Sequence, residues 1–258
     1  MSSERVSFDL EGHVGVLTMC DDARHNALSP PQVEALLAAL VLSRAEGARA
    51  LVIISGARHF CAGADIRELR KGSLLDPKQE PPANAPMNLF RALIDDPRPV
   101  IAAVNGLALG GGMELTLAAD LVLASERARF ALPELGLGVL PRTALVRLPE
   151  IVGRRKAQEL ILTRHRLEAD EALSIGLVNR LVPADELRQT AIQTAQEIIQ
   201  APPAAIAAVK RTLGRTDPCD WQAVHALLGH MRPEEWQEGF TAFLEQRPPN
   251  YDSFWQTA

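Results

Sequence analysis

Two short apolar runs that each end at a cluster of small residues most constrain how this chain can fold. Residues 51–55 lead to FCAGADI at 60–66, and residues 100–104 lead to NGLALGGGME at 105–114. Unbroken apolar runs of this length are typical of strands buried on both faces, as in α/β proteins. Glycine and alanine let a backbone N–H approach a ligand, because no large side chain stands in the way. The sequence therefore predicts an α/β fold in which two corners present bare backbone.

Strand and helix patterns alternate in the first half of the chain, and helical patterns dominate the second half. Strands are predicted at 6–10, 14–19, 51–55, 100–104 and 121–124, with helices at 29–46, 87–94 and 111–119. Further helices are predicted at 154–162, 168–175, 184–200, 203–213, 217–230 and 233–245, and a short extended segment at 177–182. Residues 71–86 contain four prolines and no apolar periodicity, which predicts a loop, either a mobile one over the substrate or a surface connection.

Composition excludes several classes of protein. The net charge of −5 is spread along 258 residues without a basic block, so nucleic acid is not an expected partner. Three distant cysteines without a C-x-x-C pair favour neither disulfides nor a zinc site, and they suggest a reducing, cytoplasmic location. The first residues lack the layout of a signal peptide. The longest apolar region, 100–124, is interrupted by polar residues and glycines, so no membrane association is expected.

A helix that begins at the triple glycine 110–112 and carries Glu114 is the first candidate site. A helix start has unpaired N–H groups that suit an oxygen gaining negative charge. Gly111 and Glu114 are three residues apart, so the N–H and the carboxylate would share one face of the helix. The alternative is that the glycines only permit a tight turn and Glu114 is a favourable acidic residue of the first turn.

The corner at Ala64 supplies a second small-residue N–H, and two donors are what an oxyanion hole requires. Glu134 lies between apolar residues in FALPELG at 130–136, where loss of solvent would raise its pKa into a range useful for proton transfer. Exposure of Glu134 in a loop is the alternative. Scattered histidines without metal-ligand spacing give no metal site, and no nucleotide-binding or serine hydrolase motif is present.

Taken together, these motifs resemble the crotonase, or enoyl-coenzyme A hydratase/isomerase, family over essentially the whole chain. The resemblance rests on RHNAL at 24–28, CAGADI at 61–66, 105–114, Pro133-Glu134, GLV at 176–178 and FLEQRPP at 243–249. It implies a spiral of strand-strand-helix units over 1–195 and a helical trimerisation region over 196–258. A homotrimer or a dimer of trimers is expected, acting on acyl-CoA thioesters in fatty acid metabolism.

The resemblance also implies roles for individual residues. The N–H groups of Ala64 and Gly111 would bind the thioester oxygen, Glu114 would deprotonate water, and Glu134 would protonate Cα. Substrate-binding positions carried over from the family are Arg24, Ala62, Asp65, Ile66 and Gly110. No cofactor is expected, since coenzyme A belongs to the substrate. The expected activity is reversible hydration of a 2-enoyl-CoA; the alternatives are an isomerase or other crotonase-type lyase, and a non-catalytic acyl-CoA binding subunit.

Two departures from the family pattern bear on the substrate. After Glu134 the family usually has a Pro-Gly-x-Gly-Gly-Thr run, whereas residues 140–148 read LPRTALVRL. We expect the bulkier Leu145 and Val146 to narrow or reshape the acyl pocket. Gln246 replaces a lysine often found in the family, which would weaken a phosphate contact to a neighbouring subunit.

Overall fold

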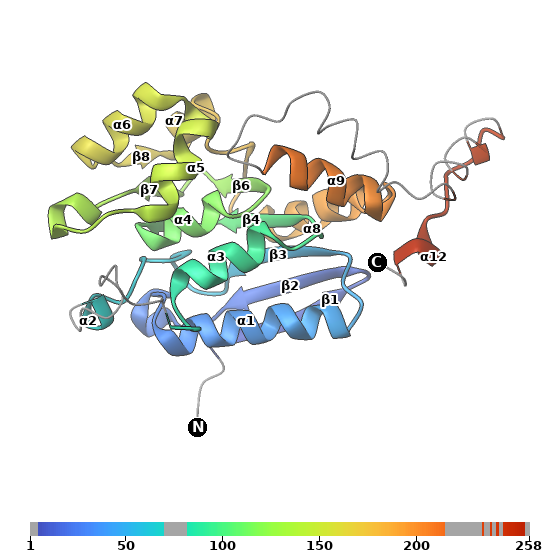
Figure 1. The fold of residues 1–258 in the computed structure, drawn as a ribbon, viewed down its shortest axis with the longest axis horizontal. Coiled ribbons are helices and arrows are strands. Elements are labelled where there is room, and N and C mark those ends of the chain that lie inside the picture. The colour runs from blue at the N-terminus through green and yellow to red at the C-terminus, as the bar shows by residue number, and fades with distance from the viewer. Residues whose placement is uncertain are drawn as a thin grey trace.

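Two β-sheets organise the residues that the computed structural model describes, which are 5–69, 82–214, 234, 238, 241–242 and 245–255. The larger sheet has six strands in the order β1-β2-β3-β4-β6-β9 (Figure 1). β1 pairs antiparallel with β2, and each later pair of neighbours is parallel. Its strands are β1 (Val6–Glu11), β2 (Val14–Met19), β3 (Ala50–Ser55), β4 (Val100–Val104), β6 (Leu121–Ser125) and β9 (Arg180–Val182).

A second, smaller sheet runs beside the first. Its three strands are β5 (Leu107–Leu109), β7 (Arg129–Ala131) and β8 (Leu167–Glu168). Isolated bridges from Leu28 to Ala64 and from Cys61 to Ala108 continue this pairing toward the N-terminus. The chain thus leaves a strand of the larger sheet, pairs briefly in the smaller one and enters a helix, which is the expected strand-strand-helix repeat. The predicted α/β class is confirmed.

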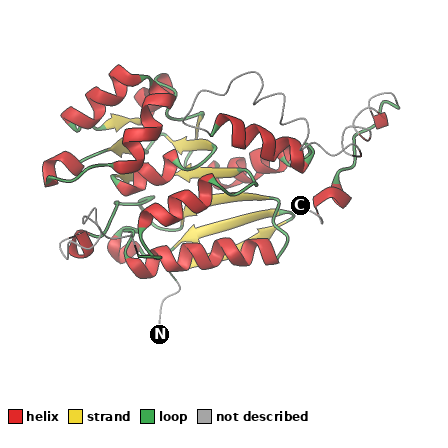
Figure 2. Cartoon of the chain, in the orientation of Figure 1, coloured by secondary structure: helices red, strands yellow, loops and turns green. Residues whose placement is uncertain are grey.

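Helices cover both faces of the larger sheet (Figure 2). Within the described residues they are α1 (Pro30–Ala45), α2 (Ile66–Leu69), α3 (Pro86–Ile94), α4 (Gly111–Leu117), α5 (Arg142–Val152), α6 (Arg154–Thr163), α7 (Ala169–Ser174), α8 (Leu187–Ile198), α9 (Pro203–Leu213) and α12 (Asp252–Trp255). Two short 3₁₀ helices span Asp22–Arg24 and Glu134–Leu137. None of the described helices is long and apolar enough to cross a lipid bilayer.

The apolar runs of the central strands follow from this two-sided cover. In β3, Leu51 and Ile53 belong to the same buried cluster as residues of α1 and α3. Val52 and Ile54, which point to the opposite face, pack instead in a cluster with residues of α8. Both faces of the strand are therefore inaccessible to water, and a polar side chain on either face would cost free energy.

Most predicted elements agree with the structure within a few residues, and β2, β4 and α9 have the predicted bounds. The prediction lacked α2, β5, β7, β8, α5, α12 and the two 3₁₀ helices. The predicted loop at 71–86 and the predicted helices at 217–230 and 233–245 lie mostly outside the described residues. The division expected at residue 195 falls inside α8, and the separation into core and helical region stays a prediction.

Candidate active site

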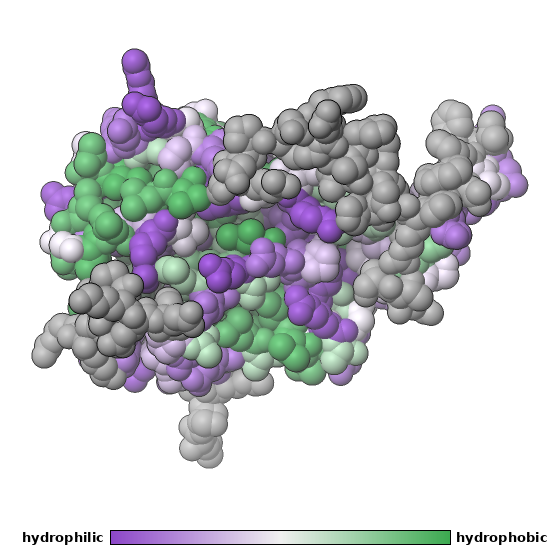
Figure 3. Space-filling model, viewed as in Figure 1, coloured by the Kyte–Doolittle hydropathy of each residue, from purple (hydrophilic) through white to green (hydrophobic). Residues whose placement is uncertain are grey.

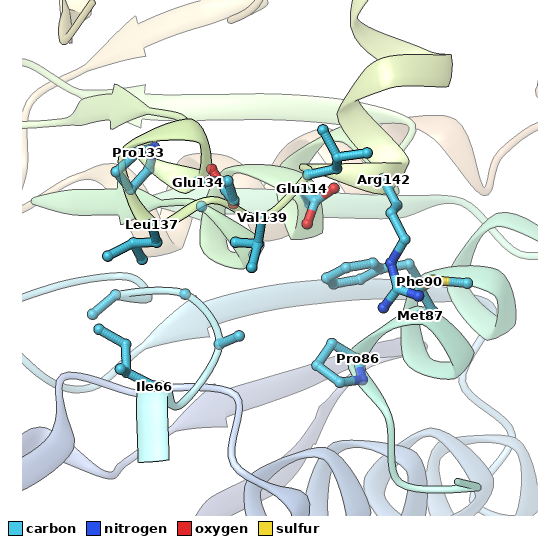
Figure 4. A pocket seen from close by; sticks show the side chains of 16 residues that line it. Ile66, Pro86, Met87, Phe90, Glu114, Pro133, Glu134, Leu137, Val139 and Arg142 are labelled. Atoms are coloured by element: carbon cyan, nitrogen blue, oxygen red, sulfur yellow. The ribbon is translucent and has the colours of Figure 1, made fainter. Parts of the chain in front are cut away.

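A cavity of about 140 Å³ lies where the start of α4, the corner after β3, the beginning of α3 and the segment after β7 meet (Figure 4). Its walls are largely apolar, with two carboxylates on one side. The residues that line it are Ala62, Gly63, Ala64, Ile66, Pro86, Met87, Phe90, Gly110, Gly111, Glu114, Pro133, Glu134, Leu137, Val139, Leu140 and Arg142. Seven of the nine residues that the sequence singled out are among them.

The two small-residue corners lie against each other at this cavity. Cys61 N–H donates to the carbonyl oxygen of Leu107 at 2.9 Å, and Leu109 N–H donates to that of Cys61, also at 2.9 Å. A Cβ placed on Gly111 would lie 3.3 Å from the backbone nitrogen of Ala64. Among the described residues, the N–H groups of Ala64 and Gly111 donate to no acceptor. Two free donors therefore stand close together in the wall of one cavity.

Two positions of this corner require glycine, Gly112 because of a close backbone contact and Gly110 because of its backbone conformation. A Cβ on Gly112 would lie 2.2 Å from the carbonyl oxygen of Cys61, so any side chain would separate the two corners. Gly110 has φ +52°, a conformation that L-residues rarely adopt. A Cβ on Gly110 would also lie 2.7 Å from Glu134 Oε1. The triple glycine thus brings backbone and carboxylate together as well as turning the chain.

Glu114 is buried, and the start of α5 holds its side chain. Its Oε1 accepts hydrogen bonds from the backbone N–H groups of Thr143 at 2.7 Å and Ala144 at 3.1 Å. Burial raises the pKa of Glu114, whereas these two hydrogen bonds and the positive charge of Arg142 oppose that rise. Unpaired N–H groups at a helix start favour the ionised form of a carboxylate.

Glu134 has a different environment on the same wall of the cavity. Its Oε2 is buried without a hydrogen-bond partner. Burial, with a further contribution from the negative charge of Glu114, raises the pKa of Glu134 to about 7. The direction of this shift agrees with the expectation that loss of solvent raises the pKa of Glu134 into a range useful for proton transfer. Two carboxylates in different environments, one held by backbone hydrogen bonds and one with an unpartnered oxygen, can serve as the base and the acid of one reaction.

Two of the residues expected to bind substrate do not line the cavity. Arg24 is exposed and ends the 3₁₀ helix at 22–24. The carbonyl oxygen of its neighbour His25 accepts a hydrogen bond of 2.9 Å from Ala62 N–H, which keeps this segment next to the corner. Asp65 is half-buried, and its carboxylate accepts a hydrogen bond from Arg67 N–H in α2.

The expectation that Leu145 and Val146 narrow or reshape the acyl pocket is wrong. Their side chains are 45% and 51% exposed and do not line the cavity, because α5 turns them outward. Together with Leu137 and Leu140 they contribute to the apolar surface on this part of the molecule (Figure 3). Within the altered segment, Leu140 and Arg142 line the cavity instead.

Sequence reasoning missed Arg142, Met87 and Phe90 as cavity residues. Residue 142 is an arginine where the family run has glycine. This substitution could have identified Arg142 as a cavity residue. Met87 and Phe90 lie in α3, whose apolar pattern only indicates a buried face. In the described part of the chain, no three histidine, cysteine or acidic side chains are grouped so that they could hold a metal ion.

Comparison with known proteins agrees with this arrangement. The sequence profile of the enoyl-CoA hydratase/isomerase family matches residues 9–254. A short-chain-enoyl-CoA hydratase of Clostridium acetobutylicum is 34% identical over 96% of this chain and 97% of its own length. A carnitinyl-CoA dehydratase of Salmonella typhi is 40% identical over 62% of this chain and 61% of its own.

Solved structures give the same result. An enoyl-CoA hydratase/isomerase of Cupriavidus metallidurans has a TM-score of 0.85 and 32% identity, with 98% of each chain covered. An enoyl-CoA hydratase of Bacillus anthracis has a TM-score of 0.83 and 30% identity, with 96% of this chain and 98% of the other covered. The chain belongs to the enoyl-CoA hydratase/isomerase, or crotonase, family of enzymes, which act on acyl-CoA thioesters.

Proposed function

We propose that this protein is an enoyl-CoA hydratase, which adds water reversibly across the double bond of a 2-enoyl-CoA thioester. The observation that carries the proposal is the arrangement around one small cavity: two free backbone N–H groups and two carboxylates in different environments. Hydration needs an electrophilic Cβ, a base for water and an acid for Cα. The cavity offers a group for each.

The N–H groups of Ala64 and Gly111 form the oxyanion hole in this proposal. Both donate to the thioester oxygen, which draws electrons from the conjugated double bond and makes Cβ electrophilic. As negative charge develops on that oxygen, the two fixed donors stabilise the enolate. A preorganised donor of this kind contributes about 3 to 4 kcal/mol at most.

Glu114 and Glu134 divide the proton transfers. Glu114, ionised and held by the N–H groups of Thr143 and Ala144, takes a proton from water as the water oxygen bonds to Cβ. Protonated Glu134 then gives its proton to Cα of the enolate. The product has gained one water molecule, and the proton on Glu114 returns to solvent or to Glu134. Dehydration uses the same groups in reverse.

Isomerisation is the main alternative, because moving a double bond needs proton transfer by one carboxylate and the same oxyanion hole. The buried, hydrogen-bonded position of Glu114 favours hydration, since a second carboxylate beside the cavity serves to activate water. A non-catalytic acyl-CoA binding subunit would need neither carboxylate.

The coenzyme A moiety would leave the cavity past Ala62 and Ile66, with Gly110 close to the thioester. Asp65 flanks this exit, and Arg24 stays near it through the hydrogen bond between Ala62 and His25, which supports a contact with the phosphates. No further cofactor takes part in the proposed reaction.

A homotrimer or a dimer of trimers, with 196–258 as the oligomerisation region, also belongs to the proposal. Val209 and Leu213 of α9 are 58% and 78% exposed, which supports burial against another subunit. A cytoplasmic location and a role in fatty acid metabolism complete it. Light scattering of the purified protein measures the oligomeric state directly.

The experiment that tests the proposal follows the fate of two substrates. The purified protein is mixed with a 2-enoyl-CoA, crotonyl-CoA, and with the corresponding 3-enoyl-CoA, and the products are separated by chromatography. Formation of 3-hydroxybutyryl-CoA from crotonyl-CoA is the expected result. Conversion of the 3-enoyl to the 2-enoyl thioester without hydration would favour the isomerase, and binding without conversion would favour the non-catalytic subunit.

A further inference from the structure

Arg142 places a positive charge at one end of the cavity whose neighbouring walls are apolar. In Figure 4 its side chain descends from the start of α5, and the guanidinium lies beside Pro86, Met87 and Phe90 of α3. These three side chains offer no hydrogen-bond acceptor except weakly through the sulfur of Met87. A guanidinium has five N–H donors in a planar fork, which matches the two oxygens of a carboxylate.

Arg142 interacts with Glu114 through its charge but pairs directly with no acidic side chain of the described residues. Among the described residues, Arg142 forms no hydrogen bond and no ion pair, whereas other arginines such as Arg44, Arg98 and Arg147 contact a carboxylate. Glu114 contributes an electrostatic interaction, but its Oε1 is occupied by the N–H groups of Thr143 and Ala144. The donors of Arg142 are therefore available to a ligand in the cavity.

The direction of the acyl group follows from the proposed function, on which this inference rests. The thioester oxygen binds at Ala64 and Gly111, and coenzyme A leaves past Ala62 and Ile66. Figure 4 shows Ile66 and Arg142 at opposite ends of the cavity. The acyl carbons beyond the double bond then extend toward α3 and Arg142. The cavity of about 140 Å³ is bounded at this end by Arg142, so the inference concerns an acyl group short enough for its far end to lie beside that residue.

We infer that Arg142 binds a carboxylate at the far end of a short acyl group, so that the preferred substrate is a 2-enoyl-CoA with a terminal carboxylate. Paired hydrogen bonds between a guanidinium and a carboxylate are stronger than neutral ones. Arg142 is exposed at the end of the cavity, so a purely aliphatic acyl chain would gain no hydrogen bond from its guanidinium, which would stay hydrated. A cationic acyl end would be repelled.

The test compares three substrates of similar length, a 2-enoyl-CoA ending in a methyl group, in a carboxylate and in a quaternary ammonium. Wild-type kcat/KM for the carboxylated substrate should exceed that for the methyl substrate by about tenfold or more, as expected for hydrogen bonds to a charged group. The ammonium substrate should be the poorest. Arg142→Gln should remove the preference, whereas the control Arg155→Gln, at an exposed arginine of α6, should keep it.

Different results separate this inference from the proposed function. Equal loss for all three substrates in Arg142→Gln, with a shifted pH profile, would mean that Arg142 only supports ionised Glu114, and the inference would be overturned. Wild-type preference for the methyl substrate would also overturn it and leave the hydratase proposal intact. If no substrate is converted, calorimetry with saturated carboxyacyl-CoA and acyl-CoA still decides: tighter binding of the carboxylated ligand, lost in Arg142→Gln, supports the inference, and equal binding contradicts it.

Discussion

Glu114 Oε1 accepts a hydrogen bond of 2.7 Å from the backbone N–H of Thr143, so the first turn of α5 fixes a carboxylate that comes from α4. A backbone donor is present with any side chain at residue 143 except that of proline. The segment that departs most from the family pattern therefore still supplies the contact that orients Glu114. Within this segment, Arg142 replaces a glycine of the family pattern and lies where the acyl group would end.

The pH profile of hydration should report the two carboxylates as a pair. Catalysis needs Glu114 ionised and Glu134 protonated, so kcat/KM should fall about tenfold per pH unit above about 7, the pKa of Glu134. It should also fall at acidic pH as Glu114 gains a proton. Dehydration should give the same profile, because the equilibrium constant for adding neutral water does not depend on pH. A rate that stays constant from pH 6 to pH 9 would contradict the assigned roles.

Gly110→Ala should inactivate the enzyme. The new Cβ would lie 2.7 Å from Glu134 Oε1 and would displace the carboxyl from the cavity. The matched control is Gly47→Ala, which has a similar positive φ of +74° but nothing within 4 Å of the new Cβ. Gly47→Ala should lose about 1 kcal/mol of unfolding free energy from backbone strain, and Gly110→Ala should lose more, because its ψ of −122° and the contact with Glu134 add to the strain. Comparable activity in the two would show that the contact with Glu134 is unimportant.

Glu134→Gln should stabilise the fold at alkaline pH. Folding raises the pKa of Glu134 from 4.5 to about 7, so the folded state binds more protons than the unfolded state in this window. Wild-type stability attributable to this group is present below pH 4.5 and is lost as pH rises through 7. Allowing for partial solvent exposure, the variant should gain about 1 kcal/mol at pH 8 and almost nothing at pH 4. Urea unfolding at both pH values measures the free energy of unfolding of wild type and variant. An equal gain in stability at pH 4 and pH 8 would contradict the raised pKa of Glu134.

Asp96→Asn should destabilise the protein core. It should leave the active-site cavity unchanged, because Asp96 does not line that cavity. Asp96 is fully buried and accepts hydrogen bonds from Arg98 Nε at 2.9 Å and Nη2 at 2.8 Å. Burial alone would raise the pKa of Asp96, but these contacts lower it. Removing the charge leaves the buried guanidinium unpaired, which costs about 3 to 5 kcal/mol. The exposed pair of Glu126 with Arg127 is the control, and Glu126→Gln should cost less than about 1 kcal/mol. Urea unfolding measures the loss of unfolding free energy in each variant. Similar losses in the two would contradict the expectation that the buried pair contributes more to stability.

The larger sheet could be predicted because its strands carry their own signal. β2 and β4 are apolar runs bounded by glycine, proline or polar residues, and their structural bounds agree with the prediction. β5 and β7 have three residues each and follow turns, so they resemble loops until they pair. α5 contains Pro149 and no clear N-cap residue, which hid a helix in the segment after Glu134.

The candidate site could be predicted in part for a similar reason. Ala64, Gly111, Glu114 and Glu134 stand in local motifs, and the chemistry of each is readable from a few residues. That they meet depends on the pairing of Cys61 with Ala108, which no local pattern specifies. The position of Arg142 depends on α3, about fifty residues away in the chain, and on the side-chain direction that α5 imposes.

The most direct test of the proposed mechanism measures crotonyl-CoA hydration, as loss of the enoyl absorbance, by the wild type and by Glu114→Gln and Glu134→Gln. Both substitutions keep the size of the side chain and remove its ionisation. Active wild type with kcat lowered by about a hundredfold to ten-thousandfold in each variant is the expected result. Loss only in Glu134→Gln would indicate a reaction with one catalytic carboxylate. Full activity in both variants would contradict the assignment of Glu114 and Glu134 as base and acid.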